Sequence, residues 1–232
     1  MGEQVDWEAY YKKQGETDEL HPEVDPTEIY RCLAALSVFP REEVASLVDV
    51  GCGDGYFCHW IAGKRKIGRV VGTDISRPRL ERAGLLYPEV EFVWGGLPRL
   101  PFADGEFEVV TCIEVLEHQM DPGAVVRELA RIAGRYVVVT VPDDSPVRTV
   151  LCPHCLKTFP ASGHLHAFTL DGLAKLGEEA GLRVDRARRY YMYPFAARRG
   201  PLRWLGWGLR RGKLLLGMPG GFFQAVRMAA GG

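Results

Sequence analysis

The segment from Val48 to Gly55, with the sequence VDVGCGDG, constrains the fold of this chain more than any other. It reads as a buried strand that runs directly into a glycine-rich loop, and a helical segment follows it. Gly51, Gly53 and Gly55 allow a sharp turn and a close approach to a ligand because they carry no Cβ atom. The start of the helix presents free backbone N–H groups. The segment therefore predicts a ligand-binding loop at the carboxyl edge of a parallel sheet.

Two carboxylates narrow the type of ligand. Asp74 ends the next predicted strand, about 20 residues further on, where an acid can hold ribose hydroxyls. A dinucleotide-binding loop would have a third glycine three residues after Gly53, but Tyr56 stands there. Asp49 precedes the loop; its charge would repel a pyrophosphate but suits a cationic ligand. S-adenosylmethionine, a nucleoside with a sulfonium and no phosphate, meets these conditions.

The chain resembles the class I S-adenosylmethionine-dependent methyltransferases in four blocks that occur in the family's order and spacing. The blocks lie between about Leu47 and Ala180, and they are DVGCGDG (49–55), VVGTDIS (70–76), LPRLPFADGEFEVVTCIEVLEH (97–118) and DPGAVVRELARI (121–132). The resemblance implies an α/β fold with a Rossmann-like, seven-stranded, mostly parallel sheet. The expected strand order is 3-2-1-4-5-7-6, with helices on both faces.

The hydrophobic pattern agrees with that fold, because strand-like and helix-like segments alternate through the middle of the chain. Thr169 is a plausible N-cap for the last helix, and Gly181 a plausible stop after it. The expected strands are 45–50, 68–74, 90–94, 107–112, 134–141, 182–192 and 222–228. The expected helices are 26–38, 55–63, 77–84, 121–132 and 170–180.

Three segments fall outside this scaffold. Residues 1–40 form a leader that carries Trp7, Tyr10 and Tyr11, and it is expected either to close over the cofactor as a lid or simply to pack on the domain. The methyltransferase domain is expected to span 41–232. It contains two insertions, at about 142–168 and 194–221.

The resemblance also implies roles at the cofactor site. Asp49 would order the loop and offer charge to the methionine ammonium, while Asp74 would hold the ribose hydroxyls. Relatives commonly carry Gly-Asp after the third strand, but Gly96 stands at the acidic position here, so the backbone of Leu97 is expected to substitute. The expected cofactor-binding residues are Asp49, Gly51, Cys52, Gly53, Asp74, Ile75, Leu97, Cys112 and Ile113.

The EVLEH string after the fourth strand is the expected reaction centre, with Glu114 and His118 as the candidate catalytic residues. One helical turn could aim Glu114, Glu117 and His118 inward. Carboxylates beside an imidazole suit either a divalent cation or a general base for a hydroxyl nucleophile, and His118 is the candidate base.

This string resembles two branches of the family, the ubiquinone-type catechol O-methyltransferases and the small-RNA 3′-terminal 2′-O-methyltransferases. In the second branch a metal is held by both glutamates, the histidine and a further histidine, for which His164 and His166 are candidates. The string also occurs in relatives without a metal, where it shapes the cofactor pocket. Both interpretations remain open from the sequence.

Cys152-Pro153-His154-Cys155 has the spacing of a zinc knuckle, in which two thiolates reach one metal ion. His164 and His166 follow within about a dozen residues, so Cys152, Cys155, His164 and His166 are the candidate zinc ligands. A zinc ion here would be structural and would stabilise an insertion that lacks a core of its own. The alternatives are a redox pair and two ordinary surface thiols.

Composition limits the range of functions. The net charge is −1 over 232 residues, so no overall field draws the chain to nucleic acid or membrane. The first residues have no apolar signal core, which predicts a cytoplasmic protein. The Arg- and Trp-rich stretch from 186 to 213 would suit an acceptor lid, peripheral membrane contact or RNA.

The leading hypothesis is therefore O-methylation of a small or lipid-linked metabolite. The alternatives are a metal-dependent RNA 2′-O-methyltransferase and a non-catalytic binding subunit that keeps the fold.

Overall fold

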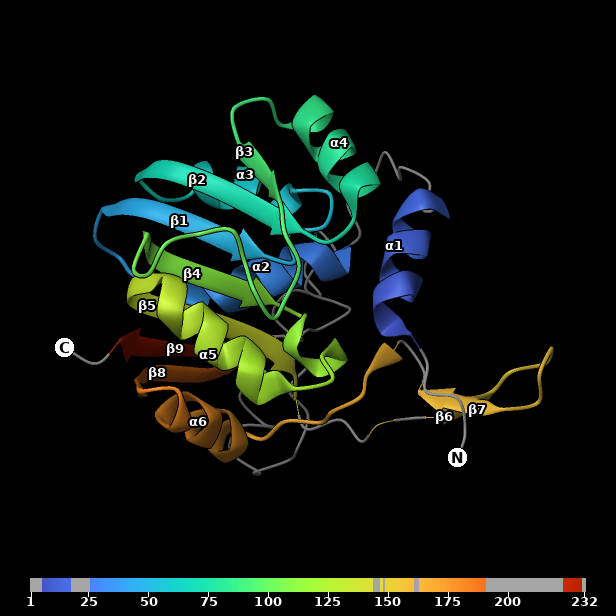
Figure 1. Cartoon of the computed structure of the whole chain (residues 1–232). Helices are drawn as coiled ribbons and strands as arrows, with labels where there is room; N and C mark the ends of the chain where they lie inside the picture. Colours follow the sequence, from blue (N-terminus) through green and yellow to red (C-terminus); the bar gives the residue numbers. More distant parts are fainter. Residues whose placement is uncertain are drawn as a thin grey trace, which may run out of the picture.

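The computed structural model describes residues 6–17, 26–143, 147, 149–160, 163–190 and 223–230, and it shows an α/β domain (Figure 1). Its main sheet contains the strands β1 (Val44–Val50), β2 (Ile67–Asp74), β3 (Glu91–Trp94), β4 (Phe107–Ile113), β5 (Ala133–Pro142), β8 (Leu182–Tyr190) and β9 (Phe223–Ala230). The helices are α1 (Trp7–Thr17), α2 (Pro26–Val38), α3 (Tyr56–Ala62), α4 (Arg77–Leu86), α5 (Pro122–Ile132) and α6 (Leu170–Glu179), with a short 3₁₀ turn η1 (Leu116–His118).

The strand order of the main sheet is β3-β2-β1-β4-β5-β9-β8. The five strands β3, β2, β1, β4 and β5 are parallel to one another, whereas β9 pairs antiparallel with both β5 and β8. This confirms the predicted order 3-2-1-4-5-7-6. The strand numbers differ only because the predicted insertion contributes a separate two-stranded hairpin of β6 (Thr149–Leu151) and β7 (Thr158–Pro160).

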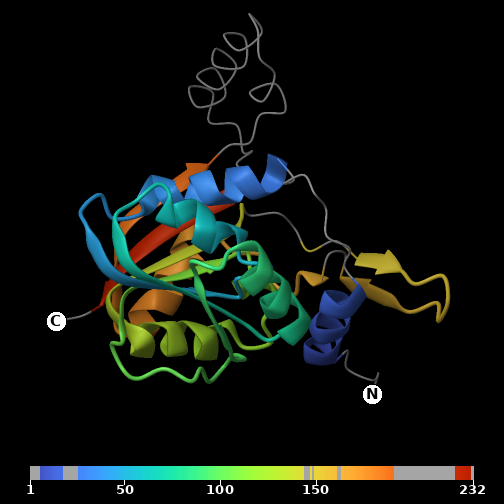
Figure 2. The same cartoon turned by 90° about the horizontal axis from the view of Figure 1, so that it is seen from above.

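Helices cover both faces of the sheet, as Figure 2 shows with α2 on one side and α5 on the other. The central strands bury side chains on both faces, which explains why β1 and β4 read as continuous apolar runs. Leu47 and Val109 pack with α2 and α3, while Val48 and Val110 pack with α5 and α6. None of the helices that the structure describes has the length and apolar character needed to cross a bilayer.

The helix ends follow the sequence signals. Asp121 caps α5, since its carboxylate accepts a hydrogen bond from the backbone N–H of Ala124 at 2.9 Å. The Thr169 hydroxyl caps α6 through the N–H of Gly172 at 3.1 Å. Gly181 follows α6 with a φ of 78°, a left-handed conformation that favours glycine. Both predicted signals for α6 are therefore confirmed.

Two described segments lie outside the sheet-and-helix layers. The leader contributes α1, a helix not predicted from the sequence, which stands near the carboxyl ends of the strands (Figure 1). The hairpin β6–β7 extends away from the sheet in both views. The predicted insertion 194–221 lies outside the described residues, so its proposed lid, membrane and RNA roles stay predictions.

A buried ion pair fixes the loop between β3 and β4, which borders the ligand cavity described below. The Glu128 carboxylate is 5% exposed and accepts hydrogen bonds from the N–H of Leu100 at 2.7 Å and from the Arg131 guanidinium at 2.7 and 2.8 Å. Arg131 in turn donates to the carbonyl of Phe102. These bonds lower the pKa of Glu128 although burial opposes them.

Replacing this carboxylate should destabilise the fold and loosen the loop. We expect Glu128→Ala to reduce the free energy of unfolding by about 3 kcal/mol, because the Arg131 charge and the Leu100 N–H lose a buried partner. The exposed Glu179 on α6 is the matched control; its Ala variant should change stability by less than about 0.5 kcal/mol. Urea denaturation measures both, and equal effects would show that the buried network is unimportant.

Candidate functional site

A cavity of about 750 Å³ opens where the parallel strands β1, β2 and β4 end. Members of both predicted groups line it: some of the cofactor candidates, and Glu114, Val115 and His118 of the EVLEH string. An open α/β sheet binds ligands at this edge. The volume is in the range of pockets that enclose a small molecule.

The glycine loop follows β1 and is held against the end of β2. The N–H groups of Gly51 and Cys52 both donate to the carbonyl of Thr73, at 2.8 and 3.0 Å. Gly51 has a φ of 76°, and a Cβ atom there would lie 2.4 Å from a methyl carbon of Val115. Gly55, at the start of α3, has a φ of 80°. Glycine is therefore required at these positions by backbone conformation and by space.

Asp74 joins the two loops that border the cavity. One carboxylate oxygen accepts the N–H of Gly53 at 2.9 Å, and the other accepts the N–H of Ser76 at 2.8 Å. Each oxygen of an ionised carboxylate has a second lone-pair site. Because Asp74 also lines the cavity, it can brace the loops and still accept bonds from two ligand hydroxyls.

Asp49 lies beneath the loop and is not among the residues that line the cavity. Its side chain is 2% exposed and accepts a hydrogen bond from the Thr111 hydroxyl at 2.6 Å. Burial raises the pKa of Asp49 to about 7. A cation bound over the loop would favour the ionised form, which agrees with the predicted indirect role.

The predicted cofactor residues thus divide into two groups. Gly51, Asp74, Ile75 and Leu97 line the cavity, together with Gly96. The remaining candidates support the site from behind or beside the loop, and they are Asp49, Cys52, Gly53, Cys112 and Ile113. The side chain of Cys112 is fully buried in the core and does not line the cavity.

The EVLEH string does not form the regular helical turn that its spacing suggested. Glu114 directly follows β4 with a φ of 55°, which is unusual for a residue other than glycine, and η1 begins two residues later. The Glu114 carboxylate lines the cavity and accepts a hydrogen bond from the Thr140 hydroxyl at 2.9 Å. Burial and the neighbouring Glu117 raise the pKa of Glu114 well above its usual value.

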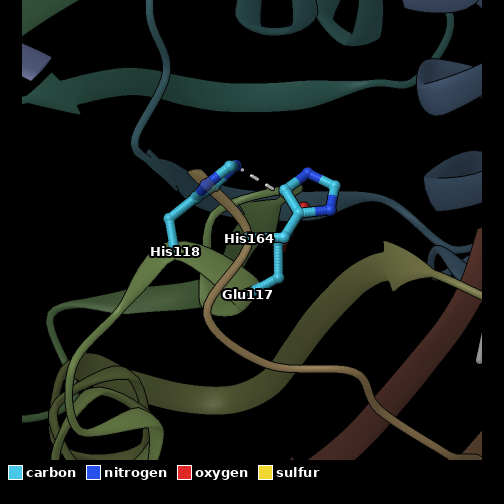
Figure 3. Close-up of side chains that lie close together, drawn as sticks. All are labelled: Glu117, His118 and His164. Atoms are coloured by element: carbon cyan, nitrogen blue, oxygen red, sulfur yellow. Dashed lines mark ion pairs between the residues drawn. The ribbon is translucent and has the colours of Figure 1, made fainter. Parts of the chain in front are cut away.

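Glu117, His118 and His164 form a compact cluster beside the cavity, and their side chains point toward one another (Figure 3). Ligand atoms of all three lie within 4.8 Å of one another, and no other such group of three or more His, Cys, Asp or Glu side chains occurs in the described part of the chain. The backbone explains how a distant histidine arrives there. The N–H groups of Leu165 and His166 donate to the carbonyl of Glu117, at 2.8 and 3.2 Å.

The cluster brings several hydrogen-bond acceptors together without donors to match them. Both carboxylate oxygens of Glu117 are buried without a hydrogen-bond partner among the described residues. Nδ1 of His118 lies 3.1 Å from the carbonyl of Gly163, which can only accept, so the tautomer with its proton on Nδ1 makes this hydrogen bond and leaves a lone pair on Nε2. That Nε2 lies 3.8 Å from Glu117 Oε1. A proton or a cation between these atoms would relieve the repulsion.

Protonation of these groups follows their burial. Burial lowers the pKa of His118 to about 4, so the imidazole is neutral at pH 7. Burial raises the pKa of Glu117 to about 7. A neutral imidazole and a carboxylate are the forms that bind a divalent cation.

The leader contributes to this site through α1. The hydroxyl of Tyr11 lies 2.6 Å from Nδ1 of His118, and Tyr10, Tyr11 and Gln14 line the cavity. The leader therefore lines part of the cavity, and its role as a lid stays a prediction. Arg31 of α2 also lines the cavity and was not singled out from the sequence. Its signal is a charge inside the otherwise apolar run IYRCLAAL.

The predicted metal ligands are not gathered as the sequence suggested. Cys152 and Cys155 lie on the hairpin, whereas His164 packs on His118 with ring centroids 4.9 Å apart. The ring of His166 lies against Phe168. The prediction that these four residues form one zinc site is therefore wrong for this structure. Hydrogen bonds to the carbonyl of Glu117 hold the segment 163–166 at η1, where His164 joins Glu117 and His118. Of the alternative set, Glu117, His118 and His164 come together, whereas Glu114 is not in that group.

Comparison with known proteins identifies the family. A family model described as "Methyltransferase domain" matches residues 26–187, which is more than half of the chain. The chain belongs to this family, and its fold and motifs place it in the class I S-adenosylmethionine-dependent methyltransferases.

Curated relatives include ubiquinone biosynthesis O-methyltransferases. The chain is 32% identical over 147 residues to the one from Alkalilimnicola ehrlichii, and the match covers 59% of this chain and 56% of that protein. It is 33% identical over 153 residues to the one from Thiobacillus denitrificans, covering 60% and 65%. The chain thus spans less than two thirds of the length of these relatives.

Solved structures share the fold. A chain in the complex between the Trm112 methyltransferase activator of Haloferax volcanii and a methyltransferase superposes with a TM-score of 0.67 at 16% identity, with full coverage of both chains. Magnesium protoporphyrin IX methyltransferase from Synechocystis PCC 6803, solved with bound S-adenosylhomocysteine, gives 0.64 at 14% identity over 97% of this chain and all of that one. At these identities the likeness shows the fold alone.

The close approach at Gly51 yields a direct test of the cavity. We expect Gly51→Ala to weaken S-adenosylmethionine binding at least roughly tenfold, because the new methyl group would strain a left-handed residue and push Val115 into the cavity. Titration calorimetry measures the affinity. Gly84→Ala in α4 is the matched control, since a Cβ there meets no atom within 4 Å and should leave binding unchanged. Unaltered affinity in Gly51→Ala would place the ligand elsewhere.

Proposed function

We propose that this protein transfers the methyl group of S-adenosylmethionine to a hydroxyl oxygen of a small or lipid-linked metabolite. The observation that carries the proposal is the cluster of Glu117, His118 and His164 beside the same cavity as the glycine loop. A hydroxyl must lose its proton to attack the methyl group, whereas many nitrogen nucleophiles attack without help. A buried set of lone pairs at the reaction edge suits that need.

The residues that line the cavity fit the cofactor. Asp74 presents two oxygens for ribose hydroxyls, and Ile75 offers an apolar surface for adenine. Gly96 leaves that region without a side-chain acceptor, so the adenine amino group would meet backbone, as at Leu97. Asp49, below the loop, would favour the positive charges of the methionine group.

The cluster also fits a divalent cation. Glu117 has two buried oxygens without a hydrogen-bond partner among the described residues, and Nε2 of His118 is a ligand atom in the tautomer that carries its proton on Nδ1. His164 completes three protein ligands and leaves positions open to an acceptor. When bound, such an ion would make an acceptor hydroxyl more acidic.

The protein's own residues supply orientation around that centre. The Gly163 carbonyl and the Tyr11 hydroxyl fix the His118 ring at Nδ1. Glu114 is held by Thr140 at the strand end and can accept a hydrogen bond from an acceptor hydroxyl. Helix α1 lines the cavity with Tyr10, Tyr11 and Gln14 and would limit the access of water during the transfer. Methyl transfer is an in-line displacement, so this positioning accounts for much of the acceleration.

The identity of the relatives supports oxygen as the acceptor atom, since several are named ubiquinone biosynthesis O-methyltransferases. An acceptor screen with radiolabelled S-adenosylmethionine tests the proposal, using catechols, simple phenols, amines and short RNA. We expect label on the oxygen of a phenolic or catechol compound. Label confined to amines or to RNA, or no transfer to any acceptor, would contradict it.

Two variants separate chemistry from binding. We expect His118→Ala to lower kcat by about 10²-fold or more while the affinity for S-adenosylmethionine changes less than about threefold, because His118 acts on the acceptor proton. Glu117→Gln should remove any stimulation by added Mg²⁺ or Mn²⁺ after treatment with EDTA. Equal losses of kcat and cofactor affinity in His118→Ala would indicate that this residue only shapes the pocket.

A further inference from the structure

The hairpin β6–β7 lacks the contacts that normally stabilise such an element. None of its residues from Thr149 to Pro160 is buried, and it extends away from the sheet (Figures 1 and 2). Leu151 is 59% exposed and Leu156 is 72% exposed. An isolated two-stranded hairpin is marginally stable in water. A stable hairpin therefore requires an additional interaction that links the two strands at the tip and covers these leucines.

The tip has the geometry of a thiolate turn. The N–H of Cys152 donates to the carbonyl of Lys157 at 2.8 Å, and the N–H of Leu156 donates back to the carbonyl of Cys152 at 2.9 Å. Leu156 has a φ of 55°, which turns the chain sharply just after the second cysteine. Both cysteines are free thiols. The Cys155 side chain contacts the Cys152 thiol, so the two sulfurs lie close together.

The surroundings of the first thiol favour its ionised form. The backbone N–H of Cys155, the N–H of His154 and the Cys155 side chain all contact the Cys152 thiol, and they lower its pKa. N–H groups that point at a sulfur stabilise a thiolate, which is the form that binds metal.

Two thiolates are half of a zinc site. Structural zinc is bound by four ligands in a tetrahedron, and sites rich in thiolate are closed. In the described part of the chain, no third His, Cys, Asp or Glu ligand atom joins the two sulfurs within 4.8 Å. His164 and His166 are held at η1 by the hydrogen bonds to Glu117. The other half must come from outside this hairpin.

We propose that Cys152 and Cys155 of two copies of this chain hold one Zn²⁺ ion between two hairpin tips. A two-fold axis through the ion supplies two thiolates from each chain, and the same patch meets itself across the interface. Leu151 and Leu156 flank the cysteines, so pairing of the tips covers the exposed apolar side chains. Zinc binding releases the thiol protons to solvent and stabilises both hairpins. This site does not depend on the proposed methyl transfer, because neither cysteine lines the cavity.

Zinc content and mass of the full-length protein, purified in the presence of a reductant, test the proposal together. Elemental analysis should give about 0.5 zinc per chain, and light scattering after size exclusion should give a dimer. EDTA should produce a zinc-free monomer, and Co²⁺ should restore the dimer with the intense charge-transfer absorption of thiolate ligands. Cys155→Ser should be a monomer without zinc that still binds S-adenosylmethionine.

His154→Ala is the matched control inside the same turn and should keep both zinc and dimer. One zinc per chain in a monomer would overturn the proposal, because the site would then be completed within one chain. A zinc-free protein with a Cys152–Cys155 disulfide would overturn it in favour of a redox pair. A dimer that persists unchanged in Cys155→Ser, or zinc lost in His154→Ala, would also contradict it.

Discussion

The rest of the site depends on the hydrogen bonds that the Asp74 carboxylate accepts. It accepts one N–H from the glycine loop and one from the turn that leads into α4. The carbonyl of Thr73, the preceding residue, accepts two more N–H groups of the glycine loop. Four donors are therefore satisfied at the end of one strand, and the loop is preorganised before any ligand arrives. Preorganisation lowers the entropy lost on binding.

The opposite situation occurs at Glu117, where a buried carboxylate has no hydrogen-bond partner among the described residues. Such a group destabilises a fold unless a proton or a cation compensates it. Its position behind His118, beside the cavity, gives this loss of stability a functional explanation. One sheet edge thus combines an acid that already accepts a hydrogen bond on each oxygen, suited to holding the cofactor, with one that accepts none from the described residues, suited to chemistry.

Much of this arrangement could be predicted from local sequence. The sheet order, the glycine loop, Asp74 and the caps of α5 and α6 follow from hydrophobic pattern and from short-range hydrogen bonding. Helix α1 was missed because its sequence is mostly polar and Trp7–Thr17 shows little apolar periodicity. The short strands β6 and β7 were missed because three exposed residues each leave no alternating pattern.

The metal ligands illustrate where sequence reasoning fails. The sequence offered His164 two sets of partners, the cysteines about ten residues away and the EVLEH string, and in the structure it lies beside His118, 46 positions earlier in the chain. Backbone hydrogen bonds to the Glu117 carbonyl decide between these partners, and they have no signature in the sequence. Arg31 enters the cavity for a similar reason, since only the packing of α2 shows which way that side chain faces.

A crystal structure with bound S-adenosylhomocysteine tests the central claim most directly. The account predicts ribose hydroxyls on the Asp74 carboxylate, adenine beside Ile75, and the sulfur directed toward His118. The bonds from Gly53 and Ser76 to Asp74 should be unchanged, because the loops are already in place. A ligand bound outside this cavity, or a glycine loop that must rearrange and release Asp74 to admit it, would contradict the account.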